Sequence, residues 1–316
     1  MHAAVVTDFD RPPAYREFPS PTPQTDDEVV VDVIASGLHP RVRSQADGSH
    51  YTSSGALPLV PGIDGVGRAR DGTIRYFVLP DTTMGAMAEQ TVIDQRRSVA
   101  LPDGTDPILV AAAMNPVMSS WIALRRRIDF EPGQTVLILG ATGSSGRMAV
   151  QVAKHLGAGH VIGAGRDAAR LASLPQLGAD TVMQLGNGTA IGDLAQAAHD
   201  VDVVIDHLWG PITAQAMAGI ATYRSDRAKP LTWIEIGSVA GPSAEIFSAA
   251  LRAVRLQIVG SGQGSVPTRD ILAELPAIAT EISGGGFELD ARAVPLADVE
   301  AAWNDTDSEQ RIVITP

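Results

Sequence analysis

Three glycines spaced three residues apart, Gly140, Gly143 and Gly146, make the pattern with the clearest chemical meaning in this sequence of 316 residues. Glycine lets a backbone turn tightly and approach an anion closely. If a helix begins at such a turn, its first N–H groups offer hydrogen-bond donors and a partial positive charge. We therefore expect this loop to hold the diphosphate of a dinucleotide. Its candidate contacts are Gly140, Thr142, Gly143, Ser144, Ser145 and Gly146.

The flanking residues predict the strand and the helix that such a loop needs. Residues 136–139 form a continuous apolar run, which is typical of a strand buried on both faces. After the loop, four apolar residues share one helical face, and Gly157 favours the end of the helix: Ala149, Val152, Ala153 and Leu156. A glycine triplet alone is also compatible with an ordinary tight turn. The order strand, loop, helix favours dinucleotide binding, and the lack of a following Lys-Ser or Lys-Thr pair argues against a P-loop nucleotidase.

Strand-like and helix-like segments alternate from residue 134 to about residue 262. The expected strands are 136–139, 160–162, 181–184, 201–205, 231–236 and 255–259, and the later helices are 167–177, 189–198, 211–221 and 242–253. Alternation of this kind predicts an α/β fold with a Rossmann-type, doubly wound parallel sheet.

The residues on either side of this region have a different character. Residues 1–105 are rich in proline, glycine and short β-prone runs, which predict a partly open β-rich domain with long loops. A helical pattern follows at 108–127, where Asn115-Pro116 predicts a break or kink. The mixed tail after residue 262 is too short for a domain, so we expect its final strand, 311–314, to return to the first domain. The predicted parts are 1–117, 118–261 and 262–316.

Composition excludes several functional classes. The formal net charge of −12 and a pI near 4.9 repel nucleic acid and anionic membrane surfaces. Aromatic residues make up only 4% of the chain, which leaves few platforms for stacking bases. Cysteine is absent, which excludes disulfides and thiolate chemistry and fits a reducing compartment. Because we find neither a signal-peptide pattern nor an apolar run of membrane-spanning length, we expect a cytoplasmic protein without a membrane partner.

The order of several motifs resembles the medium-chain dehydrogenase/reductase superfamily, in its zinc-free quinone oxidoreductase branch. The motifs are 37–40 (Gly-Leu-His-Pro), 61–67 (Pro-Gly-Ile-Asp-Gly-Val-Gly), the alanine-rich 111–121, the loop 140–146, 177–180 (Leu-Gly-Ala-Asp), 202–206 and 311–314 (Arg-Ile-Val-Ile). The resemblance implies a Rossmann-type NADP-binding domain and a β-rich, GroES-like catalytic domain. It also implies a homodimer formed through the last parallel strand, for which residues 256–259 are sufficiently apolar.

The sequence departs from the zinc-dependent relatives at their ligand positions. Where these carry cysteine and histidine, this chain has His39 and the pair Ile63-Asp64, with Asn115 near the third position. Catalytic zinc needs about three protein ligands. One imidazole and one carboxylate are too few, so we expect no metal site.

The residues after the expected strand 160–162 bear on the choice of cofactor. An acid at this strand end would bind the ribose 2′-hydroxyl of NAD. Here the strand end carries no acid, and Arg166 follows closely, with Arg170 one helical turn later. Both guanidinium groups suit the 2′-phosphate of NADPH, or else they are solvated surface residues. Asp167 is the alternative, as a ligand for NAD, but it fits a helix N-cap better. We therefore expect NADPH.

Two more strand ends are candidates for the nicotinamide half of the cofactor. Ligands bind at the carboxyl ends of parallel strands. The last two expected strands end in glycine and serine, namely Gly237 with Ser238 and Gly260 with Ser261. Their backbone groups are candidate neighbours of the nicotinamide, although glycines at strand ends also form turns in any protein.

The substrate-binding residues are inferred from the resemblance, which implies a cleft between the domains beside the nicotinamide. His39 matches an asparagine that faces this cleft, and it would donate a hydrogen bond to a quinone or enone oxygen, or a proton near neutral pH. The alternative for His39 is a loop histidine held by a backbone hydrogen bond. Ser119 matches a threonine that contacts the nicotinamide amide, or else it packs in its helix. Tyr51 is a candidate aromatic residue of the cleft wall, or else plain packing.

Together these expectations predict a zinc-independent, NADPH-dependent oxidoreductase that transfers hydride to a quinone or an α,β-unsaturated carbonyl. Two alternatives stay open. An enoyl-thioester reductase of the same fold would need a basic groove for the phosphate of its carrier. A catalytically silent NADPH-binding sensor would keep the loop and bind cofactor without turnover.

Overall fold

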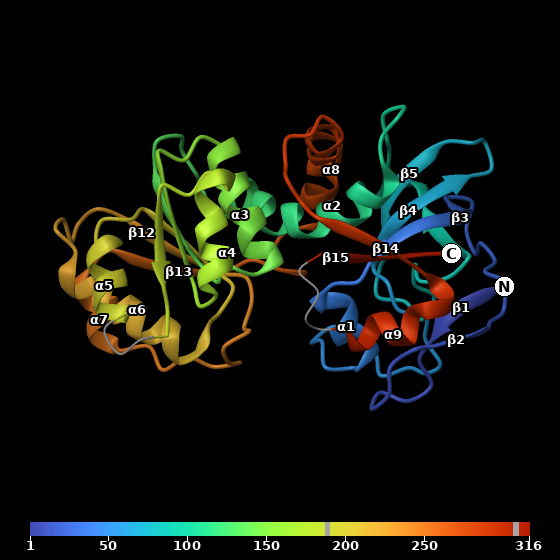
Figure 1. The fold of residues 1–316 in the computed structure, drawn as a ribbon, viewed down its shortest axis with the longest axis horizontal. Coiled ribbons are helices and arrows are strands. Elements are labelled where there is room, and N and C mark those ends of the chain that lie inside the picture. The colour runs from blue at the N-terminus through green and yellow to red at the C-terminus, as the bar shows by residue number, and fades with distance from the viewer. Residues whose placement is uncertain (187–189, 306–309) are drawn as a thin grey trace. The chain divides into compact units, whose positions relative to one another are not determined.

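The computed structural model describes residues 1–186, 190–305 and 310–316, and the chain divides into two compact units. The first unit is Met1–Asn115 with Leu272–Pro316, and the second is Pro116–Ile271 (Figure 1). The predicted domain boundaries, after residues 117 and 261, stay predictions. Residue 189, the expected start of one helix, lies outside the described residues.

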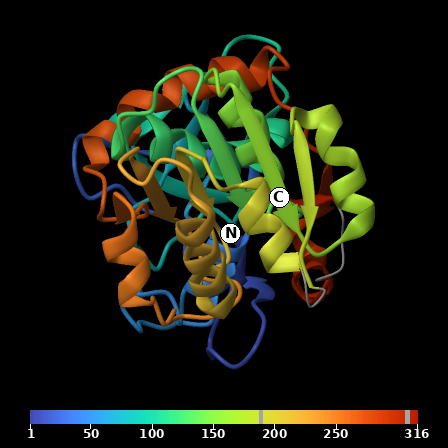
Figure 2. The same ribbon diagram turned by 90° about the vertical axis from the view of Figure 1, so that its left-hand side faces the viewer.

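The second unit is built on a six-stranded parallel sheet (Figures 1 and 2). Its strand order is β10-β9-β8-β11-β12-β13. The chain starts at the central β8, adds β9 and β10 on one side, and then returns to add β11, β12 and β13 on the other. This order confirms the predicted Rossmann-type sheet. The strands are β8 (Thr135–Leu139), β9 (His160–Gly165), β10 (Thr181–Gln184), β11 (Val203–Asp206), β12 (Leu231–Glu235) and β13 (Leu256–Gly260).

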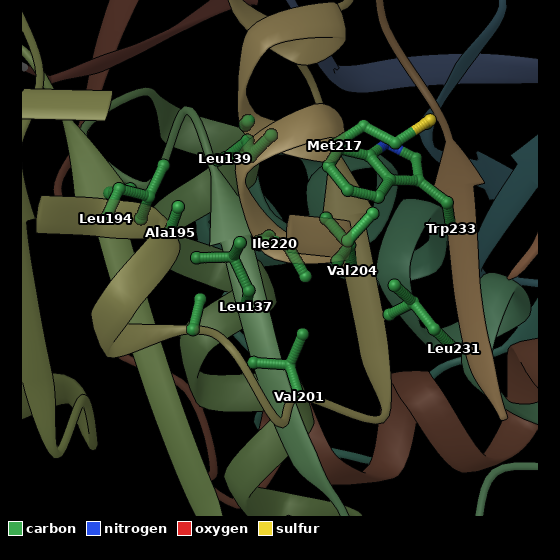
Figure 3. Packing of buried hydrophobic residues seen from close by; sticks show 14 of the residues in the cluster. Leu137, Leu139, Leu194, Ala195, Val201, Val204, Met217, Ile220, Leu231 and Trp233 are labelled. Atoms are coloured by element: carbon green, nitrogen blue, oxygen red, sulfur yellow. The ribbon is translucent and has the colours of Figure 1, made fainter. Parts of the chain in front are cut away.

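Helices lie on both faces of this sheet, and the longer ones bury one apolar side. The helices are α3 (Ser144–His155), α4 (Ala168–Ser173), α5 (Ala190–Ala197), α6 (Gly210–Tyr223) and α7 (Ser248–Ala253). On one face, Leu137, Val204 and Trp233 of the strands pack against Leu194 of α5 and Met217 of α6 (Figure 3). The expected helix 242–253 forms only from Ser248 onward, because the preceding Gly-Pro-Ser segment favours turn conformations.

The first unit holds a separate, mostly antiparallel sheet. Its order is β14-β15-β3-β4-β5-β7, and β6 also pairs with β3. The final strand β15 returns to this sheet, where Val313 lies opposite Gly37 of β3. The strands are β3 (Glu28–Gly37), β4 (Asp64–Ala69), β5 (Ile74–Val78), β6 (Gln90–Asp94), β7 (Ser98–Ala100), β14 (Ala291–Pro295) and β15 (Arg311–Thr315), and β1 (His2–Val5) pairs separately with β2 (Ala14–Glu17). The fold class is therefore as predicted.

Helices accompany the antiparallel sheet in the described residues, and the first of them was not predicted. They are α1 (Pro40–Ala46), α8 (Thr268–Ser283) and α9 (Val299–Asn304). The sequence analysis expected neither α1 nor β14. Both are short, and α1 begins with Pro40 directly after His39, where proline is favoured at the first helical position.

Helix α2 (Pro107–Ile122) runs without interruption through Pro116, so the expected break is wrong, whereas a kink at Asn115-Pro116 stays a prediction. A π-helical turn over Ala123–Arg127 extends it. Proline costs a helix interior about 3 kcal/mol, and the buried residues on both sides of Pro116, from Val110 to Leu124, offset this cost. Residues Pro107–Arg127 also pass a length and hydropathy test for crossing a membrane, contrary to the expectation that no run would. Because 67% of the apolar window is buried, the helix has the character of a core helix.

Candidate active site

The glycine loop forms a tight turn between β8 and α3. Gly140 has a φ of 86°, in the left-handed region that glycine adopts readily. The amide of Gly143 donates to the carbonyl of Gly140 at 3.1 Å and closes the turn. Gly143 is the N-cap of α3, and the first bond of the helix runs from the amide of Arg147 to the carbonyl of Gly143. The amides of residues 144–146 therefore precede the hydrogen-bonded ladder of the helix.

Two glycines of the loop have different steric surroundings. A Cβ on Gly146 would overlap the carbonyl oxygen of Gly140, so helix and turn approach each other more closely than a side chain permits. Gly143 is exposed, and a Cβ there would meet only that same oxygen, at 3.5 Å. An open surface with free amides at a helix start has the shape and charge that a diphosphate needs. The partly buried Ser144 and Ser145 lie beside it.

Thr142 has a packing role in the loop. A Cβ on Gly165, the last residue of β9, would lie 2.5 Å from the Cγ2 of Thr142. Thr142 thus fills the space that the missing side chain leaves, and the loop rests against the end of β9.

The basic residues after β9 differ from one another. Arg166 is exposed, and its guanidinium makes no hydrogen bond or ion pair with any described residue. The carboxylate of Asp167 accepts from the amide of Arg170 at 3.0 Å, which confirms Asp167 as the N-cap of α4. The same carboxylate lies 3.5 Å from the Nε of Arg170. Arg170 therefore already has an anionic neighbour, and Arg166 is the better placed arginine for a phosphate.

The remaining cofactor candidates lie where β12 and β13 end. The amide of Gly237 donates to the carbonyl of Asp206 at 3.2 Å, and Ser238 is exposed. Gly260 is the last residue of β13, and the amide of Ser261 donates to the carbonyl of Glu235. All four residues therefore lie at or just after the carboxyl ends of parallel strands, as the glycine loop does.

In the first unit, His39 belongs to a buried polar cluster. Its Nε2 lies 3.0 Å from Oδ1 of Asp64, and the hydroxyl of Tyr76 donates to Oδ2 of Asp64 at 2.8 Å. His39 and Asp64 are each 1% exposed, and Tyr76 is fully buried. Burial, together with Asp64, raises the pKa of Tyr76 well above its ordinary value, so the phenol stays protonated as a donor.

Burial favours the neutral form of His39. Burial lowers the pKa of His39, opposed by Asp64 and assisted by Arg311 and Arg41. With Asp64 as a carboxylate, the Nε2–H donates to it, and Nδ1 is left as a buried acceptor without a described partner. In this state His39 cannot donate to a substrate oxygen. It becomes a donor only when the ring is protonated, which its lowered pKa makes rare near neutral pH.

Tyr51 and Ser119 are less constrained by their surroundings. Tyr51 belongs to the first unit, is 71% exposed, and has its ring centroid 4.1 Å from that of His50. Ser119 belongs to the second unit, is partly buried and lies in α2, where Ser120 rather than Ser119 bonds to the helix backbone. Their roles in substrate or nicotinamide binding stay predictions.

Two residues at the end of β11 were not among the predicted site residues, although Asp206 closes the motif 202–206. Asp206 is fully buried and accepts four hydrogen bonds, and His207 directly after it is 8% exposed. Burial lowers the pKa of His207 to about 4. Burial also raises the pKa of the half-buried Glu235 at the end of β12, with Asp206 contributing. Ligands bind at the carboxyl ends of such strands. The position of His207 directly after an apolar run could therefore have marked it as a candidate site residue.

Within the described ranges, no three histidine or acidic side chains converge to hold a metal ion. His39 and Asp64, at two of the positions discussed for zinc ligands, bond to each other instead.

The chain matches a family model, named relatives and solved structures. A family model described as zinc-binding dehydrogenase matches residues 146–224. Over its full length the chain is 32% identical to a protein of Emericella nidulans named as a probable NADPH-dependent quinone reductase, and it covers 100% of that protein. It is also 27% identical to quinone oxidoreductase-like protein 2 of Rattus norvegicus, over 69% of this chain and 65% of the relative.

Solved structures share the fold. The quinone oxidoreductase of Thermus thermophilus, solved also as a complex with NADPH, matches with a TM-score of 0.80 and 23% identity, over 100% of both chains. A mycobacterial protein complexed with NADPH matches with a TM-score of 0.82 and 20% identity, again over 100% of both chains. At these identities the structures support the fold alone.

Proposed function

Because this chain belongs to the medium-chain dehydrogenase/reductase superfamily, in its quinone oxidoreductase branch, we propose that it is an NADPH-dependent reductase of quinones or α,β-unsaturated carbonyls. The observation that carries the proposal is the open turn between β8 and α3, where exposed Gly143 and the free amides of residues 144–146 suit a diphosphate. The named activity of the full-length relative supports the substrate class.

The residues present fit NADPH. The amides of residues 144–146 would hold its diphosphate, and the guanidinium of Arg166, which has no described partner, would bind its 2′-phosphate. The strand ends at Gly237 and Gly260 would border the nicotinamide. When bound, NADPH supplies the hydride.

We propose that the reaction is independent of zinc. His39 and Asp64 are committed to each other at 3.0 Å, and Tyr76 holds the second oxygen of Asp64. A catalytic zinc would need about three converging ligands. The polar groups of the chain would then position the substrate, with the proton for its oxygen drawn from water or from protonated His39.

Four large apolar side chains support a homodimer through β13. Val239, Phe247, Leu251 and Ile258 are all exposed, by 37% to 79%, and all lie between the end of β12 and the end of β13. Exposed apolar residues that form one patch mark interaction surfaces, and these four come from one segment of the chain. A cytoplasmic location and a small-molecule substrate complete the proposal, and the acidic composition disfavours nucleic-acid partners.

Steady-state oxidation of NADPH tests this function. We expect NADPH consumption with a simple quinone or an enone, measured by loss of absorbance. Turnover with enoyl thioesters alone would favour the enoyl-thioester reductase instead. NADPH binding without turnover on quinones, enones and enoyl thioesters would favour the sensor.

A further inference from the structure

His207 is a buried histidine whose ring has no recorded use in the fold. Its Nε2 is buried and makes no hydrogen bond with any described residue. The residue as a whole is 8% exposed. Buried polar atoms without partners are uncommon, because each costs free energy that a partner would recover.

The backbone around His207 is fixed on both sides. Its amide donates to the carbonyl of Leu139 at the end of β8, at 3.1 Å, and its carbonyl accepts from the amide of Val239 after β12. Asp206 holds the next two residues, because its Oδ1 accepts from the amides of Leu208 at 2.8 Å and Trp209 at 3.0 Å. The position of His207 is therefore set by the sheet itself.

The turn beyond His207 also adopts an unusual conformation. Trp209 has a φ of 53°, which residues other than glycine rarely take. The other oxygen of Asp206 accepts from Thr213 at 2.6 Å and from the indole of Trp233 at 2.9 Å. A buried carboxylate with four donors thus stabilises a strained turn directly after His207.

Two glycines of the candidate cofactor site lie beside His207. A Cβ on Gly140 would be 3.3 Å from the Cβ of His207, and a Cβ on Gly237 would be 3.2 Å from its carbonyl oxygen. His207 also follows β11, and the strand order turns outward in opposite directions between β8 and β11. A dinucleotide crosses the sheet at such a switch point. We place the adenosine half of the dinucleotide over β9, where Arg166 lies. The nicotinamide half then extends from the glycine loop over β11 and β12.

We propose that the Nε2 of His207 forms a hydrogen bond with a ribose hydroxyl of the nicotinamide half of the dinucleotide. The inference rests on the proposed function, because it requires a cofactor in this site. A hydroxyl both donates and accepts, so it can pair with either tautomer of a neutral imidazole. Burial keeps the pKa of His207 at about 4, and the ring is therefore neutral at pH 7.

Binding of two ligands to one pair of variants tests the inference. His207→Phe removes the ring nitrogen and keeps an aromatic ring, whereas His207→Gln keeps a polar side chain. Dissociation constants are measured by titration with NADPH and with adenosine 2′,5′-bisphosphate, which lacks the nicotinamide half. His160→Phe, in a histidine at the amino end of β9, is the matched control.

We expect His207→Phe to weaken NADPH binding by about three- to tenfold, the range of one neutral hydrogen bond, and to leave binding of the bisphosphate unchanged. His207→Gln should lose less, and the control should match the wild type. Unchanged NADPH affinity in His207→Phe, or an equal loss for both ligands, would overturn the inference. Wild-type protein that binds neither ligand would overturn the proposed function as well, which separates the two failures.

A spectroscopic measurement keeps the inference testable if His207→Phe does not fold. In wild-type protein with ¹⁵N-labelled histidine, we expect the Nε2 resonance of His207, assigned with His207→Gln, to shift on addition of NADPH and not of the bisphosphate. A resonance that stays in place with NADPH would contradict the contact.

Discussion

We propose that the preference for NADPH depends on Arg166. Its exposed guanidinium has no described partner, whereas Arg170 lies beside the carboxylate of Asp167. Hydrogen bonds to charged groups contribute about 1.5–3 kcal/mol, and about 1.4 kcal/mol corresponds to a tenfold change in affinity. A single side chain therefore has enough energy to select between the two nicotinamide cofactors.

We expect Arg166→Ala to raise the dissociation constant for NADPH by about tenfold or more and to leave that for NADH unchanged. Fluorescence titration with each cofactor measures both constants. Arg227→Ala is the control. Arg227 is exposed in the turn before β12, at the amino ends of the strands and therefore opposite the ends that carry the glycine loop. An equal loss for NADH and NADPH, or no loss at all, would remove Arg166 from the phosphate site.

His39 supports a different prediction, about pH. Burial lowers the pKa of His39, so the ring is neutral at and above neutral pH and becomes a cation only in acid. If protonated His39 assists the reduction, kcat for a quinone should rise as the pH falls below about 6.5, the ordinary value for histidine. Between about pH 7 and 9 the ring should contribute no inflection.

Comparison of pH profiles checks this assignment. His39→Asn should abolish the rise in acid, and His2→Asn, in a half-exposed histidine of the same unit, should retain it. A wild-type inflection near pH 8 that disappears in His39→Asn would show that the pKa is raised, contrary to the buried cluster.

At the scale of elements, the glycine loop brings β8 and α3 into close contact. Gly146→Ala would force a methyl group against the carbonyl of Gly140, and overpacking of this kind costs about 1–3 kcal/mol. Gly143→Ala faces only an ordinary contact of 3.5 Å. We expect thermal unfolding to show a lower Tm for Gly146→Ala and a nearly unchanged Tm for Gly143→Ala.

The same pair separates folding from binding. A methyl group on exposed Gly143 would occupy the surface that we assign to the diphosphate, so NADPH titration should show weaker binding in Gly143→Ala despite its intact fold. Wild-type affinity in Gly143→Ala would place the diphosphate elsewhere. A wild-type Tm in Gly146→Ala would contradict the close approach of helix and turn.

The elements that the sequence predicted well are those with strong local signals. The apolar run 136–139, the glycine loop and the helix after it are contiguous, and alternation along the chain was sufficient to predict the parallel sheet. The continuous helix through Pro116 was missed because burial on both sides outweighs the local cost of proline. The pattern of residues near one position does not reveal such tertiary support.

Side-chain partners were predicted less well than elements. His39 pairs with Asp64, and Asp64 with Tyr76, across 25 and 12 residues of sequence. The pairing of β4 with β5 and the turn that carries His39 bring these residues together in the fold. The hydrogen bond between His39 and Asp64 leaves only the Nδ1 of the ring without a described partner, and spacing along the chain does not reveal this pairing. His207 was missed for the same reason, since only the folded sheet brings it beside Gly140.

At the scale of the whole molecule, the two edge strands of the parallel sheet are similarly exposed, but the segments that lead to them differ. Ile258 on the edge strand β13 is 37% exposed, and Val182 on the opposite edge strand β10 is 38% exposed. Three further exposed apolar residues lie in the segment leading to β13, which is why we assign the dimer to that edge. We expect wild-type protein to have twice the chain mass of 33.0 kDa in light scattering.

Matched substitutions at the two edges test the assignment. Ile258→Lys should yield a monomer, because a charge in the centre of an apolar interface is costly, and Val182→Lys should leave the dimer intact. A monomeric wild type, or a dimer that dissociates only with Val182→Lys, would contradict pairing through β13.

The structure of the protein crystallised with NADPH tests the central claim most directly. We predict diphosphate oxygens within about 3 Å of the amides of residues 144–146, with the 2′-phosphate at Arg166. NADPH bound elsewhere, with no phosphate oxygen near these amides, would contradict the assignment of the site.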